Sequence, residues 1–250
     1  MSINQHAYVA ELMKTLAQVT SCQSAAVEKA ADLIAESITA GGVLQAFGSG
    51  HSEALAMEVS GRAGGLVPTN RLALRDIVLY GGEPADALHA TNLERTPEVA
   101  HRIYALAPVQ PGDVFVIASN SGVNGVVVEL ARLVKERGHG LIAITSMEHT
   151  RRMNSRHPSG QRLYEIADVA LDNGAPYGDA VLALPGGGAV CAASSVTAAA
   201  LAQMVVAEVV DRLIRAGQTP PVYLSSNIPD GDEHNDRLEA LYAGRIRRGA

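Results

Sequence analysis

A short apolar strand that runs directly into a glycine- and serine-rich turn and then a helix is the feature that most constrains this chain. Residues 43–47 are an apolar run, residues 48–52 read Gly-Ser-Gly-His-Ser, and a helical pattern continues to Arg62. Glycines let backbone N–H groups approach a ligand, and the first turn of a helix offers unpaired N–H groups and a dipole that favours negative charge. The sequence therefore predicts an anion site whose binding residues are Gly48, Ser49, Gly50 and Ser52.

A second strand and polar turn repeat the pattern. Residues 114–118 are an apolar run, residues 119–122 read Ser-Asn-Ser-Gly, a helix is expected from about Gly125 to Arg137, and the next strand covers 141–145. In open α/β sheets, ligands bind at the carboxyl ends of the strands, where both turns are expected. Neither turn carries Lys or Arg, which suits a phosphomonoester better than a polyphosphate with Mg²⁺. The second turn adds Ser119, Asn120 and Ser121 to the expected binding residues.

The alternation of strands and helices predicts one α/β domain over residues 1–250, with helices in 1–40 and a C-terminal active-site tail at 218–250. Residues 220–235 are rich in Pro and Gly, which argues against regular structure there. The remaining expected elements are helices at 5–20, 25–39, 85–94, 98–107 and about 190–215, and strands at 64–70 and 169–171.

Composition narrows the class of protein. Hydrophobic residues make up 47% of the 250 residues, which predicts a globular chain, and the net charge of −6 argues against nucleic acid as the main partner. Cys22 and Cys191 are far apart, which favours a reducing compartment. The polar, acidic first residues are not expected to form a secretory signal, and the uncharged run 192–207 is short for a membrane span of about 20 residues. We expect a cytoplasmic enzyme without a membrane partner.

Several cofactor motifs are absent from the sequence. The turn at 48–53 lacks the third glycine of GxGxxG, and Asn70 stands where a ribose-binding acid would be. The chain has no GxxxxGK[ST], HxxxH or CxxC pattern, so neither a nucleotide cofactor nor a metal is expected. The arginines of 147–162 are interpreted as a solvated face.

The two turns together resemble those of the sugar isomerase (SIS) domain family of phosphosugar isomerases, lyases and sensors. The matching parts are the strand with GSGHS, the strand with SNSGVN, and the ITS strand end, with Asn124 at a frequent Thr position. The resemblance implies a five-stranded parallel sheet flanked by helices, a flavodoxin-like αβα sandwich. It also implies a homodimer or homotetramer with shared active sites, in which Ser49, Ser52, Ser119 and Ser121 hold a sugar phosphate.

Two glutamates are candidates for catalysis. Residues 56–62 look like the helix that carries a catalytic Glu in phosphoheptose isomerases, at Glu58 here. Residues 81–94 look like a segment of N-acetylmuramic acid 6-phosphate etherases, whose second catalytic Glu matches Glu94. The catalytic His of phosphoheptose isomerases has no counterpart among 190–215, and the chain lacks the etherases' C-terminal extension.

Each of these residues also has a non-catalytic alternative that the sequence leaves open. Glu58 lies roughly 9 Å along the expected helix from Ser52. Burial would raise its pKa and suit it to proton transfer. The alternative is an ordinary surface Glu on an amphipathic helix. Glu94 could instead form an ion pair. His51 in the first turn could contact the sugar or cap the helix, and His234 beside two acids could open the sugar ring or be solvated.

The sequence therefore predicts an enzyme that abstracts the C2 proton of an amino-sugar 6-phosphate. Two carboxylates, a base and an acid for the leaving group, fit β-elimination at C3 of N-acetylglucosamine 6-phosphate or a relative. An aldose–ketose isomerase is the main alternative, and a sugar-phosphate sensor without catalysis is the second.

Overall fold

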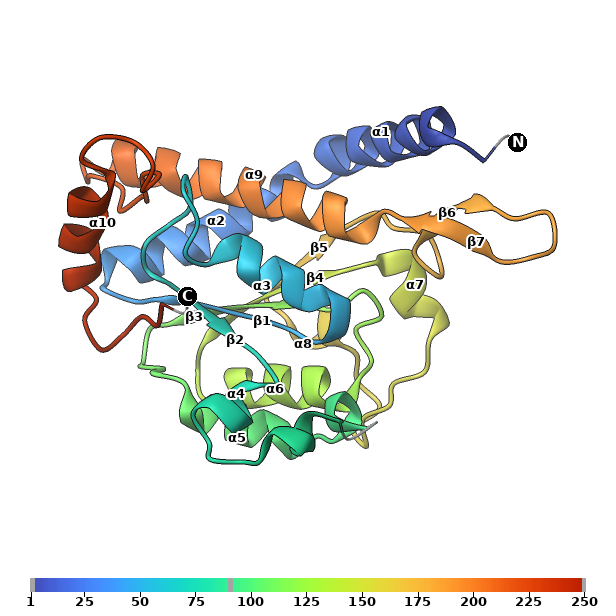
Figure 1. Ribbon diagram of the computed structural model, residues 1–250, viewed down its shortest axis with the longest axis horizontal. Helices are drawn as coiled ribbons and strands as arrows, with labels where there is room; N and C mark the ends of the chain where they lie inside the picture. The colour runs from blue at the N-terminus through green and yellow to red at the C-terminus, as the bar shows by residue number, and fades with distance from the viewer. Residues whose placement is uncertain (1–2, 90–91, 249–250) are drawn as a thin grey trace.

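A five-stranded parallel sheet forms the centre of the protein, in the order β2-β1-β3-β4-β5 (Figure 1). The structure is a computed structural model that describes residues 3–89 and 92–248. In the register of β1 and β3, Gly48 pairs with Ala118, so the two predicted turns leave the sheet at the same level. The parallel α/β sheet predicted from the sequence is thus confirmed. The strands are β1 Leu44–Gly48, β2 Thr69–Leu72, β3 Val114–Ala118, β4 Gly140–Thr145 and β5 Val169–Asp172.

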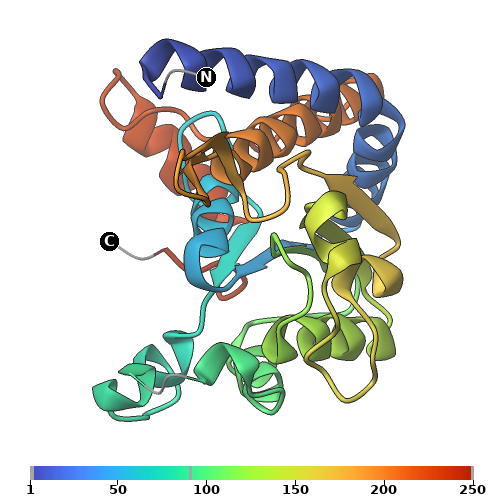
Figure 2. The same ribbon diagram turned by 90° about the vertical axis from the view of Figure 1, so that its right-hand side faces the viewer.

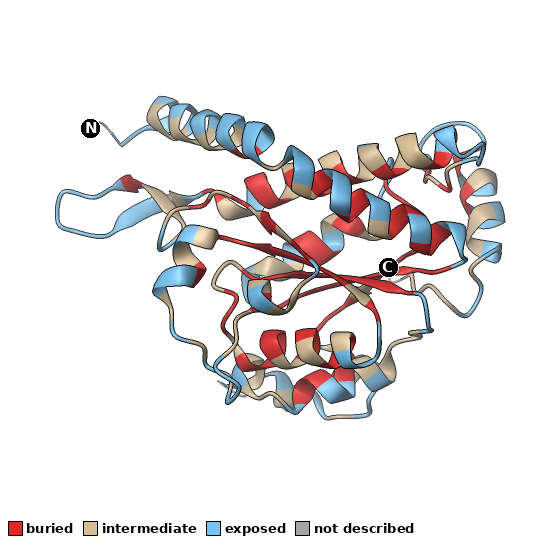
Figure 3. Cartoon of the chain, turned by 180° about the vertical axis from the view of Figure 1, so that it is seen from behind, coloured by how far each residue is buried: buried red, intermediate tan, exposed pale blue. Residues whose placement is uncertain are grey.

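Helices cover both faces of the sheet, and each face has its own apolar core (Figures 1 and 2). The strands and the inward sides of the helices are buried, whereas the outer helix faces are exposed (Figure 3). On one face lie α1 Gln5–Cys22, α2 Ser24–Thr39, α3 Glu53–Val59 and α9 Ser194–Arg215; on the other lie α4 Asp76–Leu79, α5 Val99–Leu106, α6 Gly125–Glu136 and α8 Leu163–Ile166.

The remaining elements lie at the ends of the strands. Helix α7, Met147–Arg152, follows β4, and single 3-10 turns cover Gly50–Ser52, Ala85–His89 and Leu93–Arg95. Among the helices of residues 3–89 and 92–248, none has the length and apolar character needed to cross a membrane.

The helix expected at about 190–215 ends as predicted, but the prediction was wrong at its N-terminal end. A two-stranded antiparallel hairpin, β6 Ala180–Ala183 and β7 Ala189–Ala192, precedes the helix, which begins at Ser194 rather than near 190. The hairpin projects beyond the sheet (Figure 1). Its strands are short and alanine-rich, so they lack the β-branched, alternating pattern that identifies a strand in a sequence.

Two other expectations also need correction. The second strand covers Thr69–Leu72 rather than 64–70, because the residues before it bond to the tail instead, with Leu66 bridged to Val222. The tail is not irregular throughout, since α10 covers Gly231–Ala240. Asn235 of this helix is buried and exchanges hydrogen bonds of 3.0 Å with the backbone N–H and C=O of Leu224, a tertiary contact that sequence composition does not reveal.

A buried carboxylate, Asp113, joins the start of the sheet to the tail. Its oxygens accept hydrogen bonds from the backbone N–H of Val43 at 2.9 Å, from Gln45 Nε2 at 2.9 Å and from the backbone N–H of Gln110 at 3.0 Å. Arg245 of the tail adds an ion pair at 2.6 Å, and the Asp113 side chain is fully buried. A buried carboxylate must be paired in this way, because desolvation of an unpaired charge is costly.

Replacement of this carboxylate is therefore expected to destabilise the whole fold. Asp113→Ala leaves Arg245 and Gln45 without their acceptor, and we expect the free energy of unfolding to fall by about 3–5 kcal/mol. Urea denaturation followed by circular dichroism measures the change. The matched control is Asp211→Ala, which breaks an exposed pair with Arg215 and should cost less than about 1 kcal/mol. Equal unfolding midpoints for the two variants would contradict this role.

Candidate functional site

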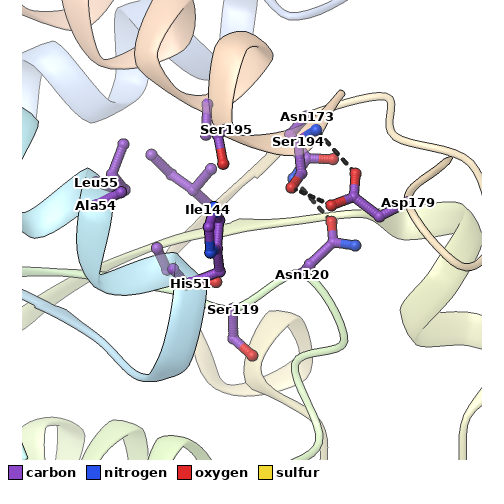
Figure 4. Close-up of a pocket in the computed structure, with 13 residues that line it drawn as sticks. His51, Ala54, Leu55, Ser119, Asn120, Ile144, Asn173, Asp179, Ser194 and Ser195 are labelled. Carbon is purple, nitrogen blue, oxygen red and sulfur yellow. Dashed lines mark hydrogen bonds between the residues drawn. The ribbon is translucent and has the colours of Figure 1, made fainter. Parts of the chain in front are cut away.

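The two predicted turns meet at one cavity of about 110 Å³ at the carboxyl edge of the sheet (Figure 4). His51 and Ser52 of the first turn and Ser119 and Asn120 of the second line it. The opposite wall comes from the start of α9 and from the segment after β5. Its polar residues are Asn173, Asp179, Ser194 and Ser195.

The first turn depends on two glycines. A Cβ on Gly48 would lie 2.2 Å from the carbonyl oxygen of Ser52, a distance that no side chain can occupy. Gly50 has φ of +56°, in the left-handed region that glycine tolerates. The turn closes through a hydrogen bond of 3.2 Å from the Ser52 N–H to the Ser49 carbonyl. This close folding carries the chain from β1 into α3 within four residues.

The second turn is held by its own side chains. Ser119 is buried, and its Oγ accepts a hydrogen bond of 3.1 Å from the N–H of Gly122, whose φ is +64°. The Oδ1 of Asn120 accepts one of 3.1 Å from Asn173 Nδ2. Ser121 is half-buried and does not line the cavity. Ser119 and Asn120 therefore shape the floor of the cavity.

Helix α6 begins directly after this turn, and its first N–H groups have no side-chain cap. Asn124 is the N-cap residue, but its Oδ1 accepts a hydrogen bond of 3.3 Å from Arg156 Nη1 instead. An uncapped helix N-terminus with a guanidinium beside it favours an anion. The sequence interpretation treated Arg156 as part of a solvated face. It is exposed, yet it reaches the turn, a contact across 32 residues of chain that no local pattern shows.

The structure brings Glu94 to the first turn. Its Oε2 lies 3.6 Å from the position that a Cβ on Gly50 would occupy, and the side chain is half-buried. The 3-10 turn Leu93–Arg95 packs on the start of α6 so closely that a Cβ on Gly125 would lie 2.3 Å from the Arg95 carbonyl oxygen. Glu94 is thus placed between the two turns by backbone packing.

Glu58 lies outside the cavity, on the exposed side of α3. Burial was expected as one alternative, but the side chain is 24% exposed. Its Oε1 accepts hydrogen bonds from Arg62 and, at 2.7 Å, from Gln203 of α9. Ala54, which lines the cavity, is one helical turn before Glu58, and both residues border an open surface beside α3.

The two candidate histidines are in different places. His51 is exposed and lines the cavity. His234 lies on α10, at the opposite end of the molecule from the β6–β7 hairpin (Figure 1). Its Nε2 makes a hydrogen bond of 3.0 Å with the carbonyl of Val222, and its Nδ1 lies 3.3 Å from Arg237. Within one chain, His234 is not brought to the turns.

The wall built by α9 was not predicted from the sequence. Asp179, with φ of +70°, accepts hydrogen bonds from Ser194 N–H at 2.8 Å and Ser194 Oγ at 2.6 Å, which ties the hairpin to the start of α9. The Nδ1 of His149 accepts a hydrogen bond of 3.1 Å from Gly178 N–H. Burial lowers the pKa of His149, and the negative charge of Asp179 partly offsets this by raising it. The signal that could have revealed this wall is the pair Ser194-Ser195 at the start of an alanine-rich helix.

Comparisons with known proteins agree with this fold. The SIS domain family matches residues 7–146, and the chain belongs to that family. It is 41% identical over 230 residues to the UPF0309 protein lmo0025 of Listeria monocytogenes, covering 92% of this chain and 93% of the relative. It is 39% identical over 245 residues to the UPF0309 protein GK1441 of Geobacillus kaustophilus, covering 98% and 95%.

Solved structures with the same fold include phosphoheptose isomerases. GmhA from Neisseria gonorrhoeae matches with a TM-score of 0.55 and 19% identity, over 82% of this chain and 96% of that one. The phosphoheptose isomerase from Francisella tularensis matches with a TM-score of 0.56 and 13% identity, over 82% and 95%. At these identities the likeness concerns the fold.

The close approach at Gly48 generates a prediction. Gly48→Ala forces its Cβ against the Ser52 carbonyl, and we expect a loss of about 1–3 kcal/mol of stability or more, together with weaker binding of phosphate at the turns. Urea denaturation and phosphate titration calorimetry measure the two effects. Gly186→Ala, where no atom lies within 4 Å of the added Cβ, is the control and should change stability by less than about 0.5 kcal/mol. If Gly48→Ala behaves like the control, the close turn is not required.

Proposed function

We propose that the protein is an enzyme that abstracts the C2 proton of an amino-sugar 6-phosphate and eliminates the substituent on C3. N-acetylglucosamine 6-phosphate or a close relative is the proposed substrate. The observation that carries the proposal is the placement of Glu94 at the turn of Gly50, beside the cavity where the two turns meet. A carboxylate beside an anion cradle can act on the sugar whose phosphate the cradle holds.

The phosphate is proposed to bind at the turns. The backbone N–H groups after Gly48 and at the start of α6 supply donors, and the hydroxyls of Ser52 and Ser119 line the same cavity. Charge-assisted hydrogen bonds of this kind to an anion are about twice as strong as neutral ones. Arg156, beside Asn124, adds a positive charge at the edge of the second turn.

The sugar is proposed to lie along the exposed side of α3, towards Glu58. Ser52 and Glu58 are six residues apart, roughly 9 Å along the helix axis. In an extended sugar 6-phosphate, the six bonds from phosphorus to C2 span roughly 7–8 Å, given bonds near 1.5 Å. Glu58 is therefore in range of C2, and its hydrogen bond from Gln203 orients the carboxylate.

The proposed chemistry uses the two carboxylates in succession. Glu58 takes the C2 proton of the open-chain aldehyde, and the electron pair moves into the C1 carbonyl as an enolate. The enolate then expels the C3 substituent, to which Glu94 gives a proton, so that water or an alcohol leaves and an α,β-unsaturated aldehyde remains. One base and one acid on separate elements fit this sequence of steps. Helix α9 offers no His for the transfer to C1 that an isomerase would need.

A second copy of this chain is proposed to complete the site. The cavity of about 110 Å³ is smaller than the about 300–1,000 Å³ of ordinary small-molecule sites. Glu58 and His51 are on its open side. In a homodimer or homotetramer, a neighbouring subunit covers this side, and His234 of that subunit is a candidate for ring opening.

Substitution of each glutamate tests the proposal, with proton NMR in D₂O as the measurement. With N-acetylglucosamine 6-phosphate, the wild type should lose the C2 proton signal and gain a vinyl signal. Glu58→Gln should slow both by about 10²–10⁴-fold, because the base is lost. Glu94→Gln should slow the vinyl signal more than the C2 exchange, because only the second step needs its proton.

The control is Glu98→Gln, an exposed residue near Glu94 that should retain full turnover. Full turnover in Glu58→Gln would exclude the mechanism. Interconversion of aldose and ketose phosphates without a vinyl signal would identify an isomerase. Saturable binding without any exchange would identify a sugar-phosphate sensor.

A further inference from the structure

A second cavity, of about 330 Å³, lies between the end of α3, strand β2, helix α4 and the C-terminal tail. It shares no lining residue with the cavity at the turns. Four arginines line it, although the chain as a whole carries a net charge of −6. They are Arg62, Arg71, Arg247 and Arg248.

The positive charge of this arginine-lined cavity is only partly compensated. Arg62 pairs with Glu58, and Arg248 lies 3.3 Å from Glu239. The guanidinium of Arg71 has no hydrogen bond or ion pair with any residue in the described part of the chain, although its charge lowers the pKa of Asp76. A guanidinium without a hydrogen-bond partner at the wall of a cavity is available to an anion.

Two buried donors in the same wall also lack partners. Ser60 Oγ and Arg247 Nη1 are buried, and neither has a hydrogen-bond partner among the described residues. Arg247 is nevertheless fixed in place, since its guanidinium stacks 4.0 Å over the ring of Tyr80 and donates to the carbonyl of Leu106. A buried donor left unpaired costs about 1–3 kcal/mol, so an acceptor that fills the cavity would recover this energy.

One carboxylate, Asp76, faces the arginines. It is buried, and its Oδ2 accepts a hydrogen bond of 3.1 Å from Ala73 N–H. Burial raises the pKa of Asp76, while Arg247, Arg71 and Arg75 act in the opposite direction. Asp76 alone does not supply acceptors for Arg71, Arg247 Nη1 and Ser60 Oγ.

We propose that this cavity binds a phosphate dianion, either free or carried by a small organic molecule. Guanidinium groups match phosphate oxygens through paired N–H donors, and the Ser60 hydroxyl supplies a further donor. Met57, Leu79 and Tyr80 are at least half exposed, at 53%, 60% and 50%. They form an apolar wall for the organic part of such a phosphate ester. The site is separate from the turns and does not depend on the reaction proposed above.

A fluorescence titration tests this site in the full-length protein. The chain contains no Trp, so Leu79→Trp places a single tryptophan, which can be excited selectively over the tyrosines, at the rim of the cavity. Inorganic phosphate and glucose 6-phosphate are titrated separately, with chloride holding the ionic strength constant. We expect a saturable change in emission with both. Equal affinities would indicate recognition of phosphate alone, and tighter binding of glucose 6-phosphate would indicate that the apolar wall also contributes.

Substitutions in the Leu79→Trp background locate the response. Arg71→Gln and Arg247→Gln should each weaken binding by about tenfold or more, since a hydrogen bond to a charged group is lost. The matched control is Arg215→Gln, an exposed arginine on α9 away from the cavity, which should leave the affinity unchanged. Arg62 is left intact because it also pairs with Glu58.

Ser119→Ala separates this site from the turns. In the Leu79→Trp background it should leave the emission change intact, because Ser119 lines only the other cavity. Loss of the response in Ser119→Ala, or unchanged affinity in Arg71→Gln, would overturn the proposal, as would the absence of a saturable response. Titration calorimetry of the chain without Trp gives a second readout: of two phosphate sites in the wild type, one should weaken by about tenfold or more in Arg71→Gln and the other should be unchanged.

Discussion

The arrangement of the site depends on the close approach of two backbone segments at Gly48. The Ser52 carbonyl lies where a side chain on residue 48 would be, so the chain can turn from β1 into α3 within four residues. The register of Gly48 with Ala118 then brings the second turn to the same level of the sheet. The two turns, each followed by the start of a helix, therefore contribute to the lining of one cavity, and neither turn contains a lysine or arginine.

The parts of this fold that follow from local sequence were predicted well. An apolar run of five residues ending in Gly and Ser predicts a buried parallel strand, and β1 and β3 lie where those runs are. The alternation of strands and helices along the chain then predicted the parallel sheet. A turn that depends on its own residues, such as the glycines of the first turn, can be predicted from one sequence.

The parts that depend on tertiary contacts were not predicted. Glu58 lies among apolar residues in the sequence, yet α3 turns it outward to Arg62 and Gln203. Helix α10 forms in a tail rich in Pro and Gly because Asn235 binds the backbone of Leu224. The wall of Asp179 and the start of α9 required the hairpin, whose alanine-rich strands carry no strand signal. The sequence identified Glu94 and His234 as candidates, but it could not show that Glu94 lies at the first turn or that His234 lies on α10, away from the turns of its own chain.

The distribution of charge separates two regions of the molecule. At the turns, we propose that helix N-termini and hydroxyls attract an anion, and Glu94 lies beside them. Past the end of α3, guanidinium groups are proposed to attract a second anion. Arg62 connects the two regions, because it lines the arginine-lined cavity and pairs with Glu58. The net negative charge of the chain is therefore compatible with the two anion sites proposed here.

Whether the two turns hold the phosphate of a sugar is tested most directly by the backbone amide spectrum of the protein with N-acetylglucosamine 6-phosphate. Two-dimensional ¹⁵N–¹H NMR reports every N–H group separately. If the turns bind the phosphate, the largest shifts should occur at residues 49–52 and 119–126, and they should saturate together. Saturable shifts confined to other residues, with both turns unmoved, would contradict it.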